Sequence, residues 1–140
     1  MKPCGVIIHH SLTKDGKIVD WDGIKRYHMR EKGWSDIGYH CGVERINGVL
    51  TALTGRPLNM TGAHCLGHND TIGICIVGNY DLAPPDDDML RYAANITAGY
   101  LRMFELPIET VHMHNEYAAK SCPGKRFPWD KFISYVSASL

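Results

Sequence analysis

The alternation of apolar and polar positions along the chain predicts five short strands. A nearly unbroken apolar run at 71–77 is typical of a strand buried on both faces, so we expect it near the centre of a sheet. Asn47-Gly48 is a strong signal for a two-residue hairpin turn between two strands. The other predicted strands span residues 5–10, 39–45, 49–53 and 109–114.

Three further segments carry apolar residues every three or four positions, which predicts amphipathic helices. The predicted helices span residues 22–32, the stretch from 84–88 to the stop at 106–107, and 128–139. Asp20 or Asp22 is expected to cap the first helix, and Gly33 to end it. The remaining segments are a turn at 14–17, a loop at 34–38, and a loop at 54–70 whose length is typical of a functional or mobile segment.

The order of these elements is strand, helix, three strands, helix, strand, helix. This order predicts an α/β fold with a mixed central β-sheet flanked by helices. The 140 residues suffice for one domain with a sizeable core, and no repeat or linker divides them. We therefore expect a single domain over residues 1–140.

Composition argues against several classes of function. Fifteen basic and fifteen acidic residues cancel, so the sequence has no electrostatic signature of a nucleic-acid or anionic-membrane partner. No apolar run is long enough to span a bilayer. The five cysteines are irregularly spaced and odd in number, which favours reduced thiols over a disulfide framework.

Candidate chemistry is concentrated near the C-terminal end, where His114, Lys120 and Cys122 fall within one short segment. Imidazole nitrogen and thiolate sulfur are both good zinc ligands. A further imidazole at the end of the predicted strand 5–10 would complete three protein ligands. The fourth tetrahedral position of zinc would then be left for water, as in catalytic sites.

The residues alone leave the ligand set open. His9 and His10 are adjacent in a predicted strand, so they point to opposite faces and only one can line a given site. His112 and His114 share a face if their strand continues through both. Two buried histidines and an inert cysteine are the alternative to a metal site. His28, on the first predicted helix, is expected to be structural.

Five segments in chain order carry a resemblance to a known family. They read IIHHSLT, GWSDIGYH, GAHCLGHN, IGICIVGN and HNEYAAKSCPG, at residues 7–13, 33–40, 62–69, 72–79 and 114–124. Together they resemble the motifs of the zinc-dependent N-acetylmuramoyl-L-alanine amidases, a family that includes small phage lysozymes and peptidoglycan recognition proteins.

The resemblance implies a ligand set. It maps the zinc ligands to His9, His114 and Cys122, with one zinc ion per chain, and so favours these residues over His10 and His112. A cysteine at the third ligand position is typical of family members with amidase activity.

The resemblance also assigns roles around the metal. Tyr39 and Lys120 map to residues implicated in family catalysis. We expect Lys120 to stabilise the oxyanion, and Tyr39 to orient the water or hydrogen-bond the intermediate. Which of the two moves the proton stays open. His64 and Asn69, on the long loop, are expected to contact the substrate.

The implied reaction is hydrolysis of the amide bond between N-acetylmuramic acid and L-alanine in peptidoglycan or muropeptides. A phage or prophage endolysin is favoured, a cytosolic muropeptide-recycling amidase is also compatible, and a peptidoglycan-binding module without turnover is the alternative from another class. The N-terminus has no signal-peptide architecture, so we expect a protein that is cytoplasmic as synthesised and acts on the cell wall after release by another factor. A regulatory protein partner, as some phage relatives have, leaves no trace in the sequence.

Overall fold

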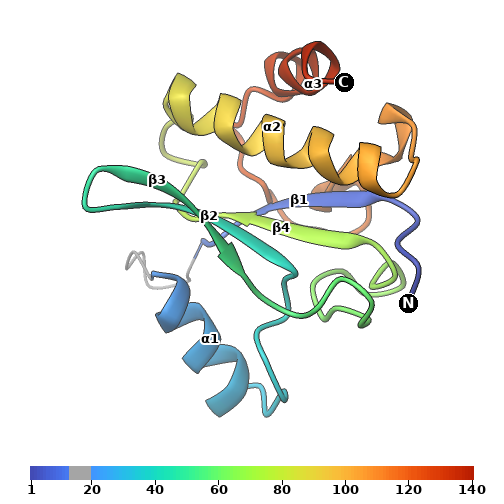
Figure 1. Ribbon diagram of the computed structural model, residues 1–140. Coiled ribbons are helices and arrows are strands. Elements are labelled where there is room, and N and C mark those ends of the chain that lie inside the picture. Colours follow the sequence, from blue (N-terminus) through green and yellow to red (C-terminus); the bar gives the residue numbers. More distant parts are fainter. Residues whose placement is uncertain (13–19) are drawn as a thin grey trace.

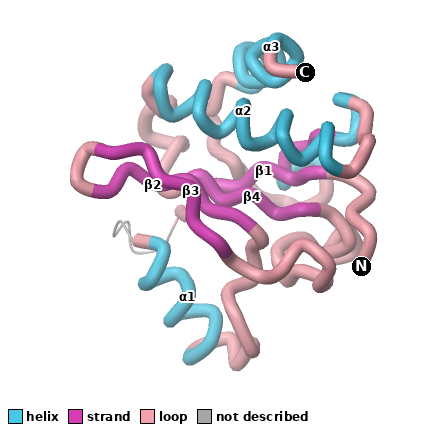
Figure 2. Tube along the Cα trace, in the orientation of Figure 1, coloured by secondary structure: helices cyan, strands magenta, loops and turns pink. Residues whose placement is uncertain are grey.

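A five-stranded sheet forms the centre of the computed structural model, which describes residues 1–12 and 20–140. The strands are β1 (Val6–His10), β2 (Cys41–Ile46), β3 (Val49–Thr54), β4 (Ile72–Ile76) and β5 (Val111–Met113). They lie in the order β3-β2-β4-β1-β5. Figure 2 shows the strands, in magenta, between helices, in cyan. β2 and β3 pair antiparallel through the predicted hairpin, and all other neighbours are parallel. The predicted mixed sheet is confirmed.

Helices cover both faces of this sheet (Figure 1). α1 (Trp21–Arg30) lies on one face, α2 (Asp87–Met103) on the other, and α3 (Trp129–Ala138) packs against α2. Two short 3-10 turns, η1 (Ile108–Thr110) and η2 (His114–Glu116), flank β5. The predicted α/β fold is therefore confirmed. Among the helices of the described chain, none is long and apolar enough to cross a membrane.

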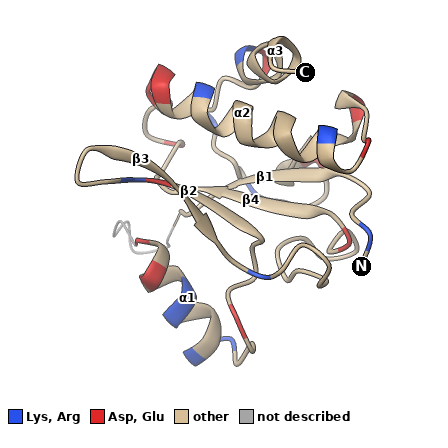
Figure 3. Ribbon diagram, in the orientation of Figure 1, with Lys and Arg blue, Asp and Glu red and all other residues tan. Residues whose placement is uncertain are grey.

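Aspartate side chains cap the first turns of α1 and α2. The Asp20 carboxylate accepts a hydrogen bond from the Gly23 N–H at 2.7 Å, and Asp86 accepts one from Met89 at 2.9 Å. These acceptors satisfy backbone donors that have no partner within the helix. Figure 3 shows acidic residues at the start of α1 and α2 and basic residues towards their ends, the arrangement that the helix dipole favours.

The two faces of the sheet have separate cores. Every residue of β1 and β4 is buried because helices cover both faces. Val6 and Ile8 pack in the core on the α2 side, whereas Cys75 of β4 packs with Trp21 on the α1 side. Since side chains alternate along a strand, His9 points to the α1 side and shares its register position with Cys75.

Two predicted strand boundaries near the site change. The strand predicted at 109–114 is reduced to β5, because residues on both sides of it form 3-10 turns. His114 therefore lies outside the strand, so it does not share a strand face with His112. The strand predicted at 39–45 begins at Cys41, which places Tyr39 before it. The turn predicted at 14–17 lies outside the described residues.

Candidate metal centre and active site

Three potential metal ligands converge at one end of β1. His9 comes from β1, His114 from η2, and Cys122 from the segment that follows. Their ligand atoms all lie within 4.8 Å of one another, and all three side chains are buried. Within the described residues, this is the one cluster of histidine, cysteine or acidic groups that could hold a metal ion. Two imidazoles and a thiol are a donor set that suits zinc and leaves one tetrahedral position open.

The fold brings these groups together from distant parts of the chain. β1 lies between β4 and β5 and runs parallel to both, so their carboxyl ends meet at one edge of the sheet. Residues 114–124, the closing segment, fold over this edge. Within it the Asn115 N–H donates to the Cys122 carbonyl at 2.8 Å. The His10 N–H donates to the Cys122 sulfur at 3.3 Å and so links this segment to β1.

A chain of hydrogen bonds lies behind His9. Its Nε2 is 2.9 Å from Nδ1 of His64, and Nε2 of His64 is 3.0 Å from the carbonyl oxygen of Thr71. The other ring nitrogen of His9, Nδ1, lies 3.7 Å from the Cys122 sulfur. Nδ1 is thus the ring nitrogen of His9 that lies towards Cys122.

Burial controls the protonation of the three ligands. It lowers the pKa of His9 well below its ordinary value, and the neighbouring imidazoles add to this shift. Burial, with the nearby charge of Lys120, lowers the pKa of His114 to about 4. Both imidazoles are therefore neutral at pH 7, the form that binds a metal. Burial raises the pKa of the Cys122 thiol to about 12.

The two alternative histidines lie outside the cluster. Nδ1 of His10 accepts a hydrogen bond from the Tyr80 N–H at 3.1 Å, on the face opposite to His9. His112 is partly exposed and its Nδ1 lies 3.1 Å from the Glu116 carboxylate. The geometry thus groups the same three residues that the family resemblance favoured.

Both predicted catalytic residues lie around this cluster. The ring of Tyr39 is 5.0 Å from the ring of His9, and burial raises the pKa of its hydroxyl well above the ordinary value. Lys120 is exposed in the closing segment. Its positive charge contributes to the lowered pKa of His114.

The side chains of His64 and Asn69, the two predicted substrate contacts, form hydrogen bonds within the protein. His64 is only 8% exposed, and both of its ring nitrogens have protein partners. The side-chain oxygen of Asn69 accepts hydrogen bonds from the N–H groups of His64 and Cys65, each at 2.8 Å. Both ring nitrogens of His64 and the side-chain oxygen of Asn69 thus have partners within the protein, and contact of either residue with substrate stays a prediction.

Comparison with known proteins shows which family the chain belongs to. A family model described as N-acetylmuramoyl-L-alanine amidase matches residues 1–125. The chain belongs to this family. It is 32% identical to the endolysin of Escherichia phage T7, over 90% of this chain and 85% of the phage protein. It is 34% identical to peptidoglycan-recognition protein LB of Drosophila melanogaster, over 86% of this chain and 54% of that protein. The predicted amidase is thereby confirmed.

Solved structures show the same amidase fold. The amidase LysC from Clostridium intestinale superposes with a TM-score of 0.81 at 23% identity, covering 97% of this chain and 86% of that one. A Drosophila PGRP-LB mutant in complex with tracheal cytotoxin has a TM-score of 0.77 at 30% identity, covering 93% and 80% of the two chains.

Sequence reasoning missed one residue that shapes the amidase site. The Asp81 carboxylate accepts hydrogen bonds from the Ser121 hydroxyl and the Lys125 N–H, both at 2.8 Å. These bonds lower the pKa of Asp81 and fasten the closing segment to the loop after β4. Its position just beyond a buried strand was the available signal, since such positions border the ligand-binding edge of a parallel sheet.

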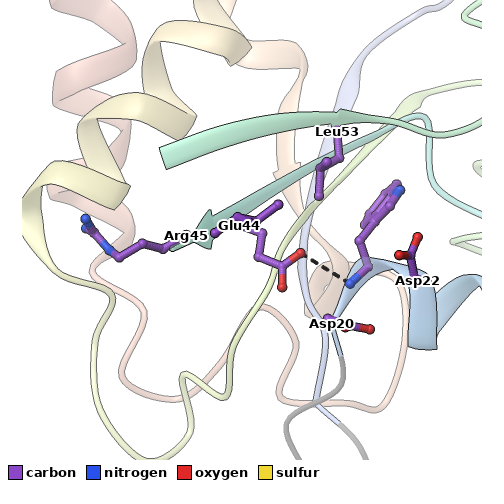
Figure 4. Close-up of a pocket in the computed structure, with 7 residues that line it drawn as sticks. Asp20, Asp22, Glu44, Arg45 and Leu53 are labelled. Atoms are coloured by element: carbon purple, nitrogen blue, oxygen red, sulfur yellow. Dashed lines mark hydrogen bonds between the residues drawn. The ribbon is translucent and has the colours of Figure 1, made fainter. Parts of the chain in front are cut away.

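A separate cavity of the amidase lies at the start of α1, beside β2 (Figure 4). The Trp21 N–H donates to Glu44 across it at 3.3 Å, and burial is the main cause that raises the pKa of Glu44. Its lining residues are Asp20, Trp21, Asp22, Glu44, Arg45, Ile46 and Leu53. This lining contains none of the three potential metal ligands, so the cavity is distinct from the candidate metal centre.

Proposed function

We propose that this amidase hydrolyses the bond between N-acetylmuramic acid and L-alanine with one zinc ion held by His9, His114 and Cys122. The observation that carries the proposal is the convergence of these three buried ligands within 4.8 Å in a chain of this family. When bound, zinc supplies an activated water at neutral pH and polarises the substrate carbonyl.

We propose Lys120 and Tyr39 as the two catalytic side chains. In this proposal the exposed ammonium group of Lys120 stabilises the negative charge that develops on the carbonyl oxygen. Tyr39, packed against the ring of His9, orients the attacking water or hydrogen-bonds the intermediate.

A phage-type endolysin is the biological role that we favour. The endolysins of phages T7 and T3 are 32% and 31% identical to this chain, which covers 85% of each. In this role the protein is made in the cytoplasm and reaches peptidoglycan with the help of another factor. The solved complex of PGRP-LB with tracheal cytotoxin supports a soluble muropeptide as the other substrate class.

A peptidoglycan-binding module without turnover is the rival function. The recognition proteins among the relatives support it, whereas the intact ligand set and the 32% identity to a human N-acetylmuramoyl-L-alanine amidase favour turnover. The sequence is silent on a regulatory protein partner, and a pull-down from infected or host cells would detect one.

Mass spectrometry of digestion products tests the proposed reaction. Purified peptidoglycan and a soluble muropeptide are incubated with the protein in separate reactions. We expect peptides that begin with a free L-alanine amino group, and the better substrate distinguishes an endolysin from a recycling enzyme. New glycosidic or internal peptide ends would reject amidase specificity, and unchanged substrates would favour the binding module.

A further inference from the structure

The buried ring of His64 determines which nitrogen of His9 carries a proton. A carbonyl oxygen can only accept, so Nε2 of His64 must donate to Thr71. A neutral imidazole has one N–H, which makes Nδ1 of His64 an acceptor. Nε2 of His9 must then donate to it, which leaves the lone pair of His9 on Nδ1, facing the Cys122 sulfur. The neutral state of His64 follows from its burial between a carbonyl and another imidazole, because neither could compensate a buried charge.

Two glycines form a slot that fixes the ring of His64. A Cβ atom at Gly73 would lie 2.5 Å from Cγ of His64, and the three atoms nearest to it all belong to this ring. A Cβ atom at Gly62 would lie 2.5 Å from Cδ2 of the same ring. Both distances are too short for any residue other than glycine unless the ring moves. The slot therefore sets the direction of both hydrogen bonds of His64.

We propose that His64 is a positioning residue, which holds His9 in the tautomer and orientation that present Nδ1 to the metal. The inference rests on the proposed zinc centre and goes beyond it, because it gives a role to a side chain that does not itself bind zinc. Hydrogen-bond partners of metal-bound histidines commonly change metal affinity by about 10- to 100-fold.

This role differs from a substrate contact in what it changes. A substrate contact would alter KM and leave zinc affinity untouched. A positioning residue alters zinc affinity even when no substrate is present, so the test needs no turnover measurement.

The main experiment measures zinc affinity by competition with a chromophoric chelator. His64→Phe keeps a ring in the slot but removes both nitrogens, and we expect about 10- to 100-fold weaker zinc binding. His64→Gln carries one acceptor and one donor at the end of its side chain, so we expect partial recovery. His28→Phe is the matched control: it also removes a buried imidazole with a backbone hydrogen bond, from Gly38 at 2.9 Å, but leaves His9 untouched.

Gly73→Ala provides an independent variant. It removes no polar atom, yet its Cβ must displace the ring of His64, so we expect weaker zinc binding here as well. Circular dichroism shows whether each variant is folded. Should a variant fail to fold, the tautomers of His9 and His64 can still be measured in the wild-type protein.

Nitrogen NMR of the metal-free protein with ¹⁵N-labelled histidine reads those tautomers. We expect the proton of His9 on Nε2 and the proton of His64 on Nε2. A His9 proton on Nδ1 would overturn the proposal, as would wild-type zinc affinity in both His64→Phe and Gly73→Ala. A wild-type protein that binds no zinc would instead refute the metal centre itself, so the two failures are distinguishable.

Discussion

The two sides of the candidate metal centre are built differently. On the sheet side, His9 lies in a central strand, and both the residue behind it, His64, and its backbone partner Thr71 are buried. The other side is the closing segment, which contributes two buried ligands but exposes most of its remaining side chains, including Lys120. One side is fixed by the core, and the other is a surface loop fastened at a few points.

The rigid side suits metal binding, and the exposed side suits contact with substrate. A ligand on a rigid strand holds its direction without reorganisation, which favours metal binding. A charged side chain on an exposed loop can meet a substrate that arrives from solvent. We therefore expect changes on the sheet side to alter zinc affinity, and a change at Lys120 to alter turnover with zinc retained.

Cys122→Ser should have the largest effect, because the sulfur of Cys122 joins the two sides. A neutral hydroxyl is a much poorer zinc ligand than a thiolate, so we expect zinc and hydrolysis to be lost together. Metal analysis and release of peptides from peptidoglycan measure the two losses. Cys41→Ser is the control, since this buried thiol lies in the apolar core. A Cys122→Ser protein with one zinc per chain would refute the ligand assignment.

Lys120→Ala tests the exposed side alone. We expect stoichiometric zinc and an unchanged unfolding temperature, with turnover lowered by about 100- to 1000-fold, as for loss of an oxyanion donor. Steady-state hydrolysis of a soluble muropeptide gives kcat and KM separately. Lys125→Ala removes another exposed charge nearby and should retain normal turnover. Equal rates for Lys120→Ala and the wild type would rule out the oxyanion role.

Acid should destabilise the α1 side of the sheet through His28. Burial lowers the pKa of His28 from 6.5 to about 4, so the folded protein resists a proton that the unfolded chain accepts. The contribution of His28 to stability is complete above pH 6.5 and is lost as the pH falls towards 4. Urea unfolding of the metal-free protein at several pH values measures this loss.

His28→Asn sharpens this prediction. Asparagine keeps an acceptor for the Gly38 N–H but cannot be protonated, so stability should depend less steeply on pH between 4 and 6.5. A variant with the same pH dependence as the wild type would show that His28 is not responsible.

The smallest effects on zinc are expected from the two histidines outside the cluster. His10→Ala loses the bond to the Tyr80 N–H and should be less stable. His112→Ala loses a pair with Glu116 and a ring contact with Tyr117. Both should bind one zinc per chain in metal analysis. Loss of zinc from either variant would mean that the ligand set is wrong.

Local patterns in the sequence predicted the fold well. Continuous apolar runs mark β1 and β4 because both faces of these strands are buried, and the hairpin signal at Asn47-Gly48 lies between β2 and β3. The end of β5 was misjudged because the chain enters a 3-10 turn at His114, a change of backbone that hydrophobic periodicity does not record.

The site was harder to predict. Strand alternation places His9 and His10 on opposite faces but cannot say which of them belongs to the candidate metal centre. The bond between His9 and His64 joins residues 55 positions apart, so no local spacing reveals it. The glycines at 62 and 73 resemble ordinary loop and strand glycines in sequence, and their contact with the His64 ring emerges only in three dimensions.

We propose that zinc, held by the strand ligand and the closing segment together, enables hydrolysis. Zinc content and hydrolysis of the same sample, before chelation, after chelation and after zinc is returned, test it most directly. We expect one zinc per chain, hydrolysis that disappears with the metal, and hydrolysis that returns with it. Full hydrolysis by a protein from which all zinc has been removed would refute the zinc mechanism.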